Sequence, residues 1–166
     1  MERPKFVLFY LLNMTLPLPE NIFSKNIFKL YFMADEYKTH FAPMLIHKDG
    51  NAAIEFYKKA FDAKVERKFD NPDGTVHVAE LSIDGVIFHL REESAAKRHF
   101  DPGTIKGATV LIELHVADPD AVMAKALAAG GQQLNPVTYY EETGYRQGSL
   151  KDPFGHQWLI HRRMIP

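Results

Sequence analysis

The sequence predicts an α+β fold in which two tandem β-α-β-β-β units form a curved mixed sheet around a cavity. The first observation is that one short strand, one amphipathic helix and three further strands follow each other in this order twice after residue 41. The second is that Asp84-Gly85 and Asp152-Pro153-Phe154-Gly155 both precede an apolar strand, with the glycines 70 residues apart (155 − 85 = 70). One helix per unit covers one face of its sheet, which leaves the other face free to curve around a cavity.

The first unit, residues 41–93, begins with a short apolar strand over 44–46 and a helix capped by Asp49. The helical periodicity places five apolar residues on one face of this helix, namely Ala53, Phe56, Tyr57, Ala60 and Phe61. Three strands follow, over 64–69, 76–83 and 86–90. The turns between these strands contain Asp-Gly, which supplies the positive φ that a tight hairpin requires.

A polar, irregular connector over residues 94–107, with a turn at 101–103, leads to the second unit, residues 108–166. This unit begins with a strand over 110–116, followed by Asp118-Pro119, an N-cap with proline at the first helical position. The apolar face of its helix contains Val122, Met123, Ala126 and Leu127, and the helix ends at Gly130-Gly131. Its other strands are expected over 133–140, 145–150 and 157–161.

Residues 1–40 differ from both units, and we assign them as a leader or arm whose role the sequence leaves open. Basic residues before an apolar run over 6–12 resemble a signal peptide, but no small-residue cleavage site follows. A membrane span needs ~20 apolar residues, and neither this run nor the one over 22–32 is long enough. Three alternatives remain: an appended leader with Met33 as the natural start, an arm packed on the domain or on a partner, and a secretory signal.

The composition of the 166 residues excludes several classes of function. With 20 basic and 21 acidic residues the net charge is −1, so we expect neither nucleic acid nor a membrane as partner. The absence of cysteine excludes disulfides, thiolate catalysis and cysteine-ligated zinc. Eight histidines keep metal binding and acid/base chemistry open. We expect a cytoplasmic protein.

The motifs resemble those of one known superfamily. The residues concerned are Ile54-Glu55-Phe56-Tyr57 in the first helix, Asp152-Pro153-Phe154-Gly155-His156 before the last strand, Arg146 upstream of it, Ala128-Ala129-Gly130-Gly131, and Ala79-Glu80-Leu81. Over residues 41–164 the chain resembles the vicinal oxygen chelate superfamily, the group of glyoxalases, bleomycin-resistance proteins and extradiol dioxygenases, and most of all its PhnB-like branch. The resemblance implies a small-molecule ligand held in a cavity. It also implies a homodimer, because members usually build their cavities from paired units.

In catalytic members of that superfamily, four ligands on four strands hold one divalent metal, and the resemblance assigns four positions to them. These are Ala42, His89, about Leu111, and Leu159. Only His89 carries a side chain that binds metal, so the usual ligand set is incomplete.

A shifted set of ligands is the alternative, because side chains two residues apart share one face of a strand. It consists of His89, Glu113 or His115, and His161, with Zn, Ni, Mn or Fe as the metal. Without metal, His89 and His115 would line the cavity as hydrogen-bonded imidazoles. His161 is expected near the rim, since Arg162-Arg163 follow it.

Three further residues are candidates for contacting a ligand. Tyr145 and Arg146 lie where they could hold an anionic group, while the alternative for Arg146 is a salt bridge to Glu141, Glu142 or Asp152. Trp158 suits an aromatic wall or, alternatively, the core. His156 is expected to hydrogen-bond the local backbone of its turn.

Three functional interpretations therefore remain open. The first is a PhnB-like protein that binds a small molecule in its cavity and lacks a complete metal-ligand set. The second is a metal-dependent lyase, isomerase or dioxygenase that uses the shifted set. The third is a structural or regulatory module whose cavity is filled by its own side chains.

Overall fold

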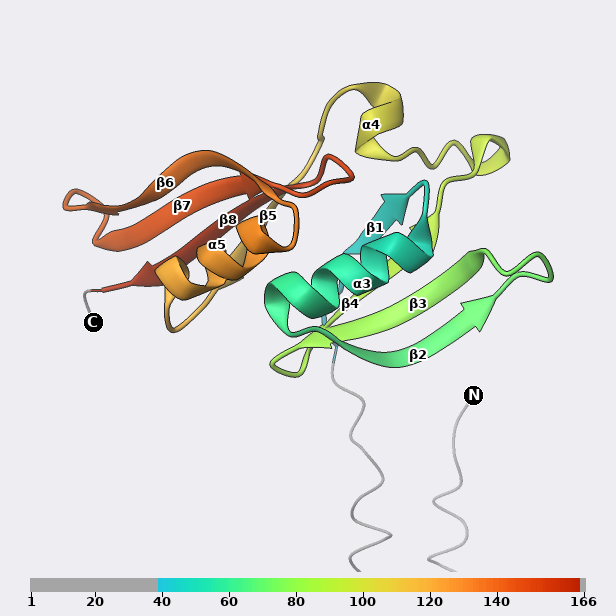
Figure 1. The fold of residues 1–166 in the computed structure, drawn as a ribbon, viewed down its shortest axis with the longest axis horizontal. Coiled ribbons are helices and arrows are strands. Elements are labelled where there is room, and N and C mark those ends of the chain that lie inside the picture. Colours follow the sequence, from blue (N-terminus) through green and yellow to red (C-terminus); the bar gives the residue numbers. More distant parts are fainter. Residues whose placement is uncertain (1–38, 165–166) are drawn as a thin grey trace, which may run out of the picture. The chain divides into compact units, whose positions relative to one another are not determined.

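The computed structural model describes residues 39–164, and the predictions for the segment before residue 39 lie outside this part of the chain. The first half contains β1 (Met44–His47), α3 (Gly50–Phe61), β2 (Lys64–Asp70), β3 (Val76–Ile83) and β4 (Val86–Glu92). The second half contains β5 (Leu111–His115), α5 (Pro119–Ala128), β6 (Gln132–Tyr140), β7 (Tyr145–Lys151) and β8 (Gln157–Arg163). The order β-α-β-β-β thus occurs twice, which confirms the predicted fold class (Figure 1).

Each half forms its own four-stranded mixed sheet. The strand orders are β1-β4-β3-β2 and β5-β8-β7-β6. In both sheets the first strand of the half pairs in parallel with the last, and the remaining pairs are antiparallel. β1 and β5 are therefore edge strands, and each presents side chains to both faces of its sheet near that edge.

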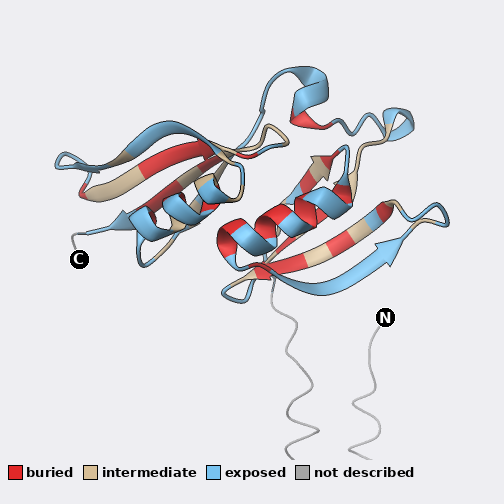
Figure 2. Ribbon diagram, viewed as in Figure 1, coloured by how far each residue is buried: buried red, intermediate tan, exposed pale blue. Residues whose placement is uncertain are grey.

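The two helices begin at the predicted caps. The Asp49 side chain accepts a hydrogen bond from the backbone N–H of Ala52, and the Asp118 side chain accepts one from Ala121. The five predicted apolar residues of α3 are buried, together with Ile54, whereas on α5 only Met123 and Ala126 of the predicted four are fully buried. Figure 2 shows this buried side of α3 and the exposed edge strand β2.

The connector differs from its prediction as irregular chain. It contains a 3-10 turn, η2 (Ala95–Lys97), and a one-turn helix, α4 (Pro102–Ile105). The helix forms because the carboxylate of Asp101, which is almost fully buried, accepts a hydrogen bond from Gly103 N, and proline occupies the first helical position. A short turn expected from Asp-Pro-Gly thus continues into a full helical turn.

The two halves meet where α3 packs against α5. The Trp158 ring of β8 lies with its centroid 5.6 Å from that of Tyr57 and 4.7 Å from that of Phe61, both on α3. All three side chains are buried. Each sheet is thus covered by a helix on one face, and we call the opposite face of each sheet its open face.

The two halves follow the same register. His89 pairs with Met44, and Leu159 pairs with Glu113. Met44 and Glu113 each precede the N-cap of their helix by five residues (49 − 44 and 118 − 113). The equivalence of His89 and Leu159 that the spacing of the glycines predicts is therefore also present in the strand pairing.

No helix within residues 39–164 is long and apolar enough to cross a membrane.

Candidate functional site

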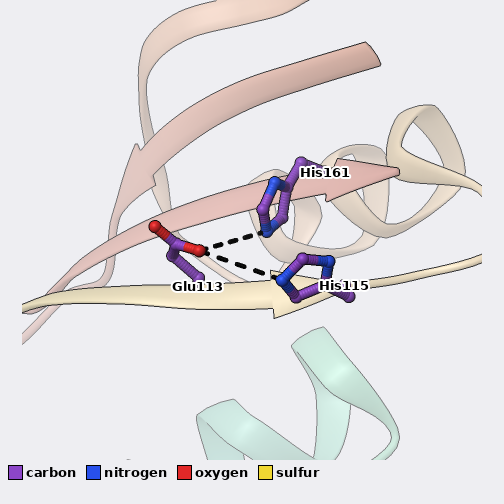
Figure 3. Close-up of side chains that lie close together, drawn as sticks. All are labelled: Glu113, His115 and His161. Carbon is purple, nitrogen blue, oxygen red and sulfur yellow. Dashed lines mark ion pairs between the residues drawn. The ribbon is translucent and has the colours of Figure 1, made fainter. Parts of the chain in front are cut away.

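Two adjacent strands of the second sheet place one carboxylate and two imidazoles on its open face. On β5, Ile112 and Leu114 pack against the core, so the alternating residues Glu113 and His115 point to the other face. On β8, His161 lies directly opposite His115 in the parallel register. Figure 3 shows that the three side chains converge.

The convergence brings three possible metal-ligating atoms within 4.8 Å of one another. The Glu113 Oε2 atom is 3.8 Å from His115 Nε2 and 3.7 Å from His161 Nε2, and the two rings have centroids 3.8 Å apart. The Glu113 and His115 side chains are more than half exposed, while that of His161 is only 5% exposed. His161 is thus held in place by its surroundings, whereas the side chains of Glu113 and His115 can change rotamer.

His161 is the member of the cluster with a buried ring nitrogen that no described residue satisfies. Its Nε2 atom is buried and has no hydrogen-bond partner among the described residues. Burial lowers the pKa of His161, the neighbouring His115 lowers it further, and Glu113 acts in the opposite direction. A neutral imidazole with a bare nitrogen is the form that ligates a metal. The expectation that His161 lies near the rim is wrong, because β8 continues to Arg163 and the Tyr145 ring stacks on His161, with centroids 5.3 Å apart.

The donor set fits a divalent metal. Two imidazoles and one carboxylate suit zinc, nickel or iron, and leave coordination positions for other ligands. In a tetrahedral zinc site, ligand atoms lie about 3.3 Å apart, as bond lengths near 2.0–2.2 Å require. Glu113 and His115 would therefore have to move by about an ångström, which exposed side chains can do by rotamer changes.

His89 lies apart from this cluster. It occupies the open face of the first sheet, where its Nε2 atom is 3.4 Å from the Glu80 carboxylate on the adjacent strand β3. Its equivalent in the second half, Leu159, lies beside Glu113. The ligand set with His89 is therefore not brought together in this chain, whereas Glu113, His115 and His161 are.

Arg146 is held by a partner that the sequence did not indicate. Its Nε and one terminal nitrogen bind the two carboxylate oxygens of Asp120 on α5, at 2.6 and 2.7 Å. This pair raises the pKa of Arg146 and lowers that of Asp120. The salt-bridge alternative is correct, but its predicted partners Glu141, Glu142 and Asp152 are wrong. Arg146 lies on the same face of β7 as the buried Leu150, and α5 packs against β7.

Trp158 has a structural contact and also lines a pocket. It is 2% exposed, and its indole N–H donates to Asp152 Oδ2 at 3.1 Å. The same Asp152 oxygen accepts a 2.7 Å hydrogen bond from the Tyr57 hydroxyl. Burial raises the pKa of Tyr57, and the charge of Asp152 raises it further, so this hydroxyl remains a donor.

His47 is a buried residue of this network that sequence reasoning did not find. It is fully buried, and its Nε2 atom is 3.4 Å from the Tyr57 hydroxyl. Because that hydroxyl donates to Asp152, we assign the proton of His47 to Nε2, which leaves Nδ1 without a partner among the described residues. Burial, and secondarily His156, lower the pKa of His47 to about 3.

His156 departs from its prediction as well. Its Nε2 atom lies 3.0 Å from the carbonyl oxygen of Ile46, a residue of the other half, and not on the local backbone. It is the His156 backbone N–H that caps the turn, by donating to Asp152 Oδ1 at 2.9 Å.

An apolar pocket lies between the edge strands of the two sheets. Its volume is about 310 Å³, and its walls come from β1, the end of β3, β4, β5, β8 and the segments before β1 and β5. Among the described residues that line it, Glu113 is the only charged one, and Trp158 forms part of the wall. Glu113 therefore belongs to both the pocket and the His/Glu cluster.

Comparisons of the sequence and of the structure with known proteins find relatives with the same fold. The family model described as Glyoxalase/Bleomycin resistance protein/Dioxygenase superfamily matches residues 39–160. The uncharacterised protein Mb0911c of Mycobacterium bovis is 36% identical over 133 residues, which cover 77% of this chain and 86% of that protein. The X-ray structure of the At5g48480 product of Arabidopsis thaliana has a TM-score of 0.60 and 28% identity, and covers 75% of this chain and 98% of that one. TioX from Micromonospora sp. ML1 shares the fold, with a TM-score of 0.60 at 23% identity over 76% of this chain and 99% of its own. The protein therefore belongs to the glyoxalase/bleomycin resistance protein/dioxygenase superfamily.

Proposed function

We propose that this protein is a PhnB-like member of its superfamily that binds a small, largely apolar molecule in the pocket between the edge strands. The observation that carries this proposal is the pocket of about 310 Å³ with a wall that is apolar apart from Glu113. Ligand pockets are typically concave and mostly apolar, with a few polar groups that fix orientation. The volume lies near the lower end of the usual range, about 300–1,000 Å³, which favours a small ligand.

Exposed apolar side chains at the pocket support a homodimer. Phe41 is 91% exposed, Val86 70%, Val110 63% and Leu111 51%, and all four line the pocket. Large apolar side chains gathered at one place are typical of surfaces that another molecule covers. We propose that a second copy of the chain covers them, and light scattering should give twice the chain mass of 19.0 kDa. A mass near that of one chain would contradict this.

The pocket is tested with a hydrophobic fluorescent dye and a pair of matched variants. Leu111 on β5 and Leu134 on β6 are both exposed leucines on edge strands of the second sheet, but only Leu111 lines the pocket. Leu111→Lys should weaken dye binding about tenfold or more, because it places a charge against the apolar wall. Leu134→Lys should leave it unchanged.

Two results would contradict the pocket proposal. Equal effects of both lysine variants would show that the dye binds elsewhere. A dye that does not bind the wild-type protein would instead favour the third interpretation, a structural module with a filled cavity.

A metal-dependent lyase, isomerase or dioxygenase is the second candidate function, and the His/Glu cluster favours it. Members of the superfamily often use a divalent metal. Glu113, His115 and His161 would hold the ion, and Glu113 would connect it to the ligand pocket. The ion would supply a Lewis acid near the polar end of a bound ligand. The buried Nε2 atom of His161, which has no hydrogen-bond partner among the described residues, supports this assignment.

Metal binding is tested by titrating chelator-stripped protein with Zn, Ni, Mn and Fe. His161→Ala should abolish stoichiometric binding, whereas His89→Ala should leave it unchanged, because His89 faces Glu80 on the other sheet. Glu113→Gln and Glu80→Gln form a second matched pair, of which only Glu113→Gln should weaken binding. No binding above micromolar affinity in the wild-type protein would exclude the enzyme, and loss of binding in His89→Ala would contradict the proposed ligand set.

A further inference from the structure

Arg91 places an unpaired cation on the open face of the first sheet. It lies near the end of β4, where the flanking Leu90 is fully buried against the core, so Arg91 and His89 point to the opposite face. Its neighbour on β1 is Ile46, and the antiparallel register with β3, continued by one residue, places Val78 on its other side. Arg91 thus has an apolar residue on each side of it on this face of the sheet.

No described residue neutralises this guanidinium. No hydrogen bond or ion pair reaches the side chain of Arg91 within residues 39–164, and its Nε atom is buried. The nearest carboxylates in the sequence have other partners. Glu92 Oε1 accepts hydrogen bonds from Gly50 N and Val76 N, and Glu93 Oε2 accepts from Asp101 N and the Thr104 hydroxyl.

The internal repeat shows how this face differs from that of the second sheet. The pair Ile46 and Arg91 in the first sheet corresponds to His115 and His161 in the second, because each lies two residues beyond the equivalent pairs described above. At these positions the second sheet therefore carries two imidazoles that can bind a cation. The first sheet instead carries a cationic side chain next to apolar residues.

We propose that Arg91 anchors an oxyanion-binding site on the open face of the first sheet. The ligand class is a carboxylate, phosphate or phosphonate attached to an apolar group. A guanidinium binds two oxygens of such a group in parallel, and a buried Nε–H gains most from an ionic partner because water does not reach it. The apolar group would lie over Ile46 and the half-exposed Met44.

The site shares no residue with the apolar pocket or with the His/Glu cluster. The Arg91 site therefore goes beyond the proposed function, and an experiment can contradict one of the two proposals without contradicting the other.

The side-chain Nε–H resonance of Arg91 in the full-length protein provides the test, with inorganic phosphate, benzoate and benzyl alcohol as probes at constant ionic strength. The Arg91→Lys spectrum identifies the resonance. We expect saturable shifts with phosphate and benzoate but none with the neutral alcohol, and tighter binding of benzoate if the apolar flank contributes. Arg91→Gln should weaken benzoate binding by about tenfold or more, the effect of losing a charge-assisted hydrogen bond.

The matched control is Arg163→Gln, which removes the same charge from an exposed arginine of β8 and should leave the affinity unchanged. Equal losses in Arg163→Gln and Arg91→Gln would show non-specific charge attraction and overturn the proposal. So would an Arg91 Nε–H resonance in the wild-type protein that no anion shifts, and this result does not depend on how any variant folds.

Discussion

His47 makes the free energy of unfolding depend on pH, and its burial sets the size of the effect. Its pKa is about 3 in the folded chain, against about 6.5 for an exposed histidine. Between these values the unfolded chain binds one more proton at this residue than the folded chain does. Stability is therefore fully present above pH 6.5 and falls by about 1.4 kcal/mol per unit as the pH decreases toward 3. From pH 7 to pH 4 the loss is about 3 kcal/mol.

Two titratable side chains, those of His156 and Tyr57, lie next to His47, but burial remains the main cause of its lowered pKa. His156 faces it with ring centroids 4.8 Å apart, and its charge lowers the pKa of His47. Tyr57 also lies beside His47, and its hydroxyl donates a hydrogen bond to Asp152. Protonation of His47 would add a proton at Nδ1, which has no acceptor among the described residues.

The assay is denaturant unfolding at pH 7, 6, 5 and 4, followed by fluorescence of Trp158, the single tryptophan. His47→Phe removes the titrating group and keeps an aromatic ring beside Phe154. The difference in stability between pH 7 and pH 4 should be about 3 kcal/mol smaller in His47→Phe than in the wild-type chain. The control is His77→Phe at an exposed position, which should retain the wild-type dependence. Equal pH dependence of wild type and His47→Phe would show that His47 does not cause the loss of stability at low pH.

Two further predictions concern the turn between β7 and β8, which contains Asp152 and Gly155. Gly155→Ala should destabilise by roughly 1–3 kcal/mol more than Gly74→Ala, because both have positive φ but only Gly155 lies against another backbone segment. Thermal melts of both variants test this, and equal losses would contradict it. Tyr57→Phe should cost about 1–3 kcal/mol, since it removes a buried donor to Asp152, while the exposed Tyr139→Phe should cost almost nothing. Similar melting temperatures for the two phenylalanine variants would show that the Tyr57 hydroxyl contributes little.

Local patterns in the sequence were sufficient to predict the fold. Asp49 and Asp118 mark the helix starts because an N-cap acts within one turn, and Asp84-Gly85 marks a hairpin because both residues adopt positive φ, 48° and 80°. These signals act over a few residues and are readable without knowing the tertiary structure. The repeat then followed from the spacing of Gly85 and Gly155.

The candidate site could be predicted only in part. Glu113, His115 and His161 were named because residues two apart share a strand face, and the parallel pairing of β5 with β8 brings them together. That His89 lies on another sheet depends on how the sheets form, which spacing does not determine. The partners of Arg146, His156 and His47 lie 26, 110 and 10 residues away, and these contacts arise from packing between elements. The hydrogen bond from Tyr57 to Asp152, 95 residues apart, has the same origin.

Energy transfer from Trp158 to a bound hydrophobic dye reports whether a ligand enters the pocket between the edge strands, because this single tryptophan forms part of the pocket wall. We expect the dye to quench Trp158 fluorescence almost completely and to saturate at one molecule per chain. The Leu111→Lys variant should lose this transfer. Dye binding that never saturates, or that leaves Trp158 fluorescence unchanged, would contradict a ligand pocket between the edge strands.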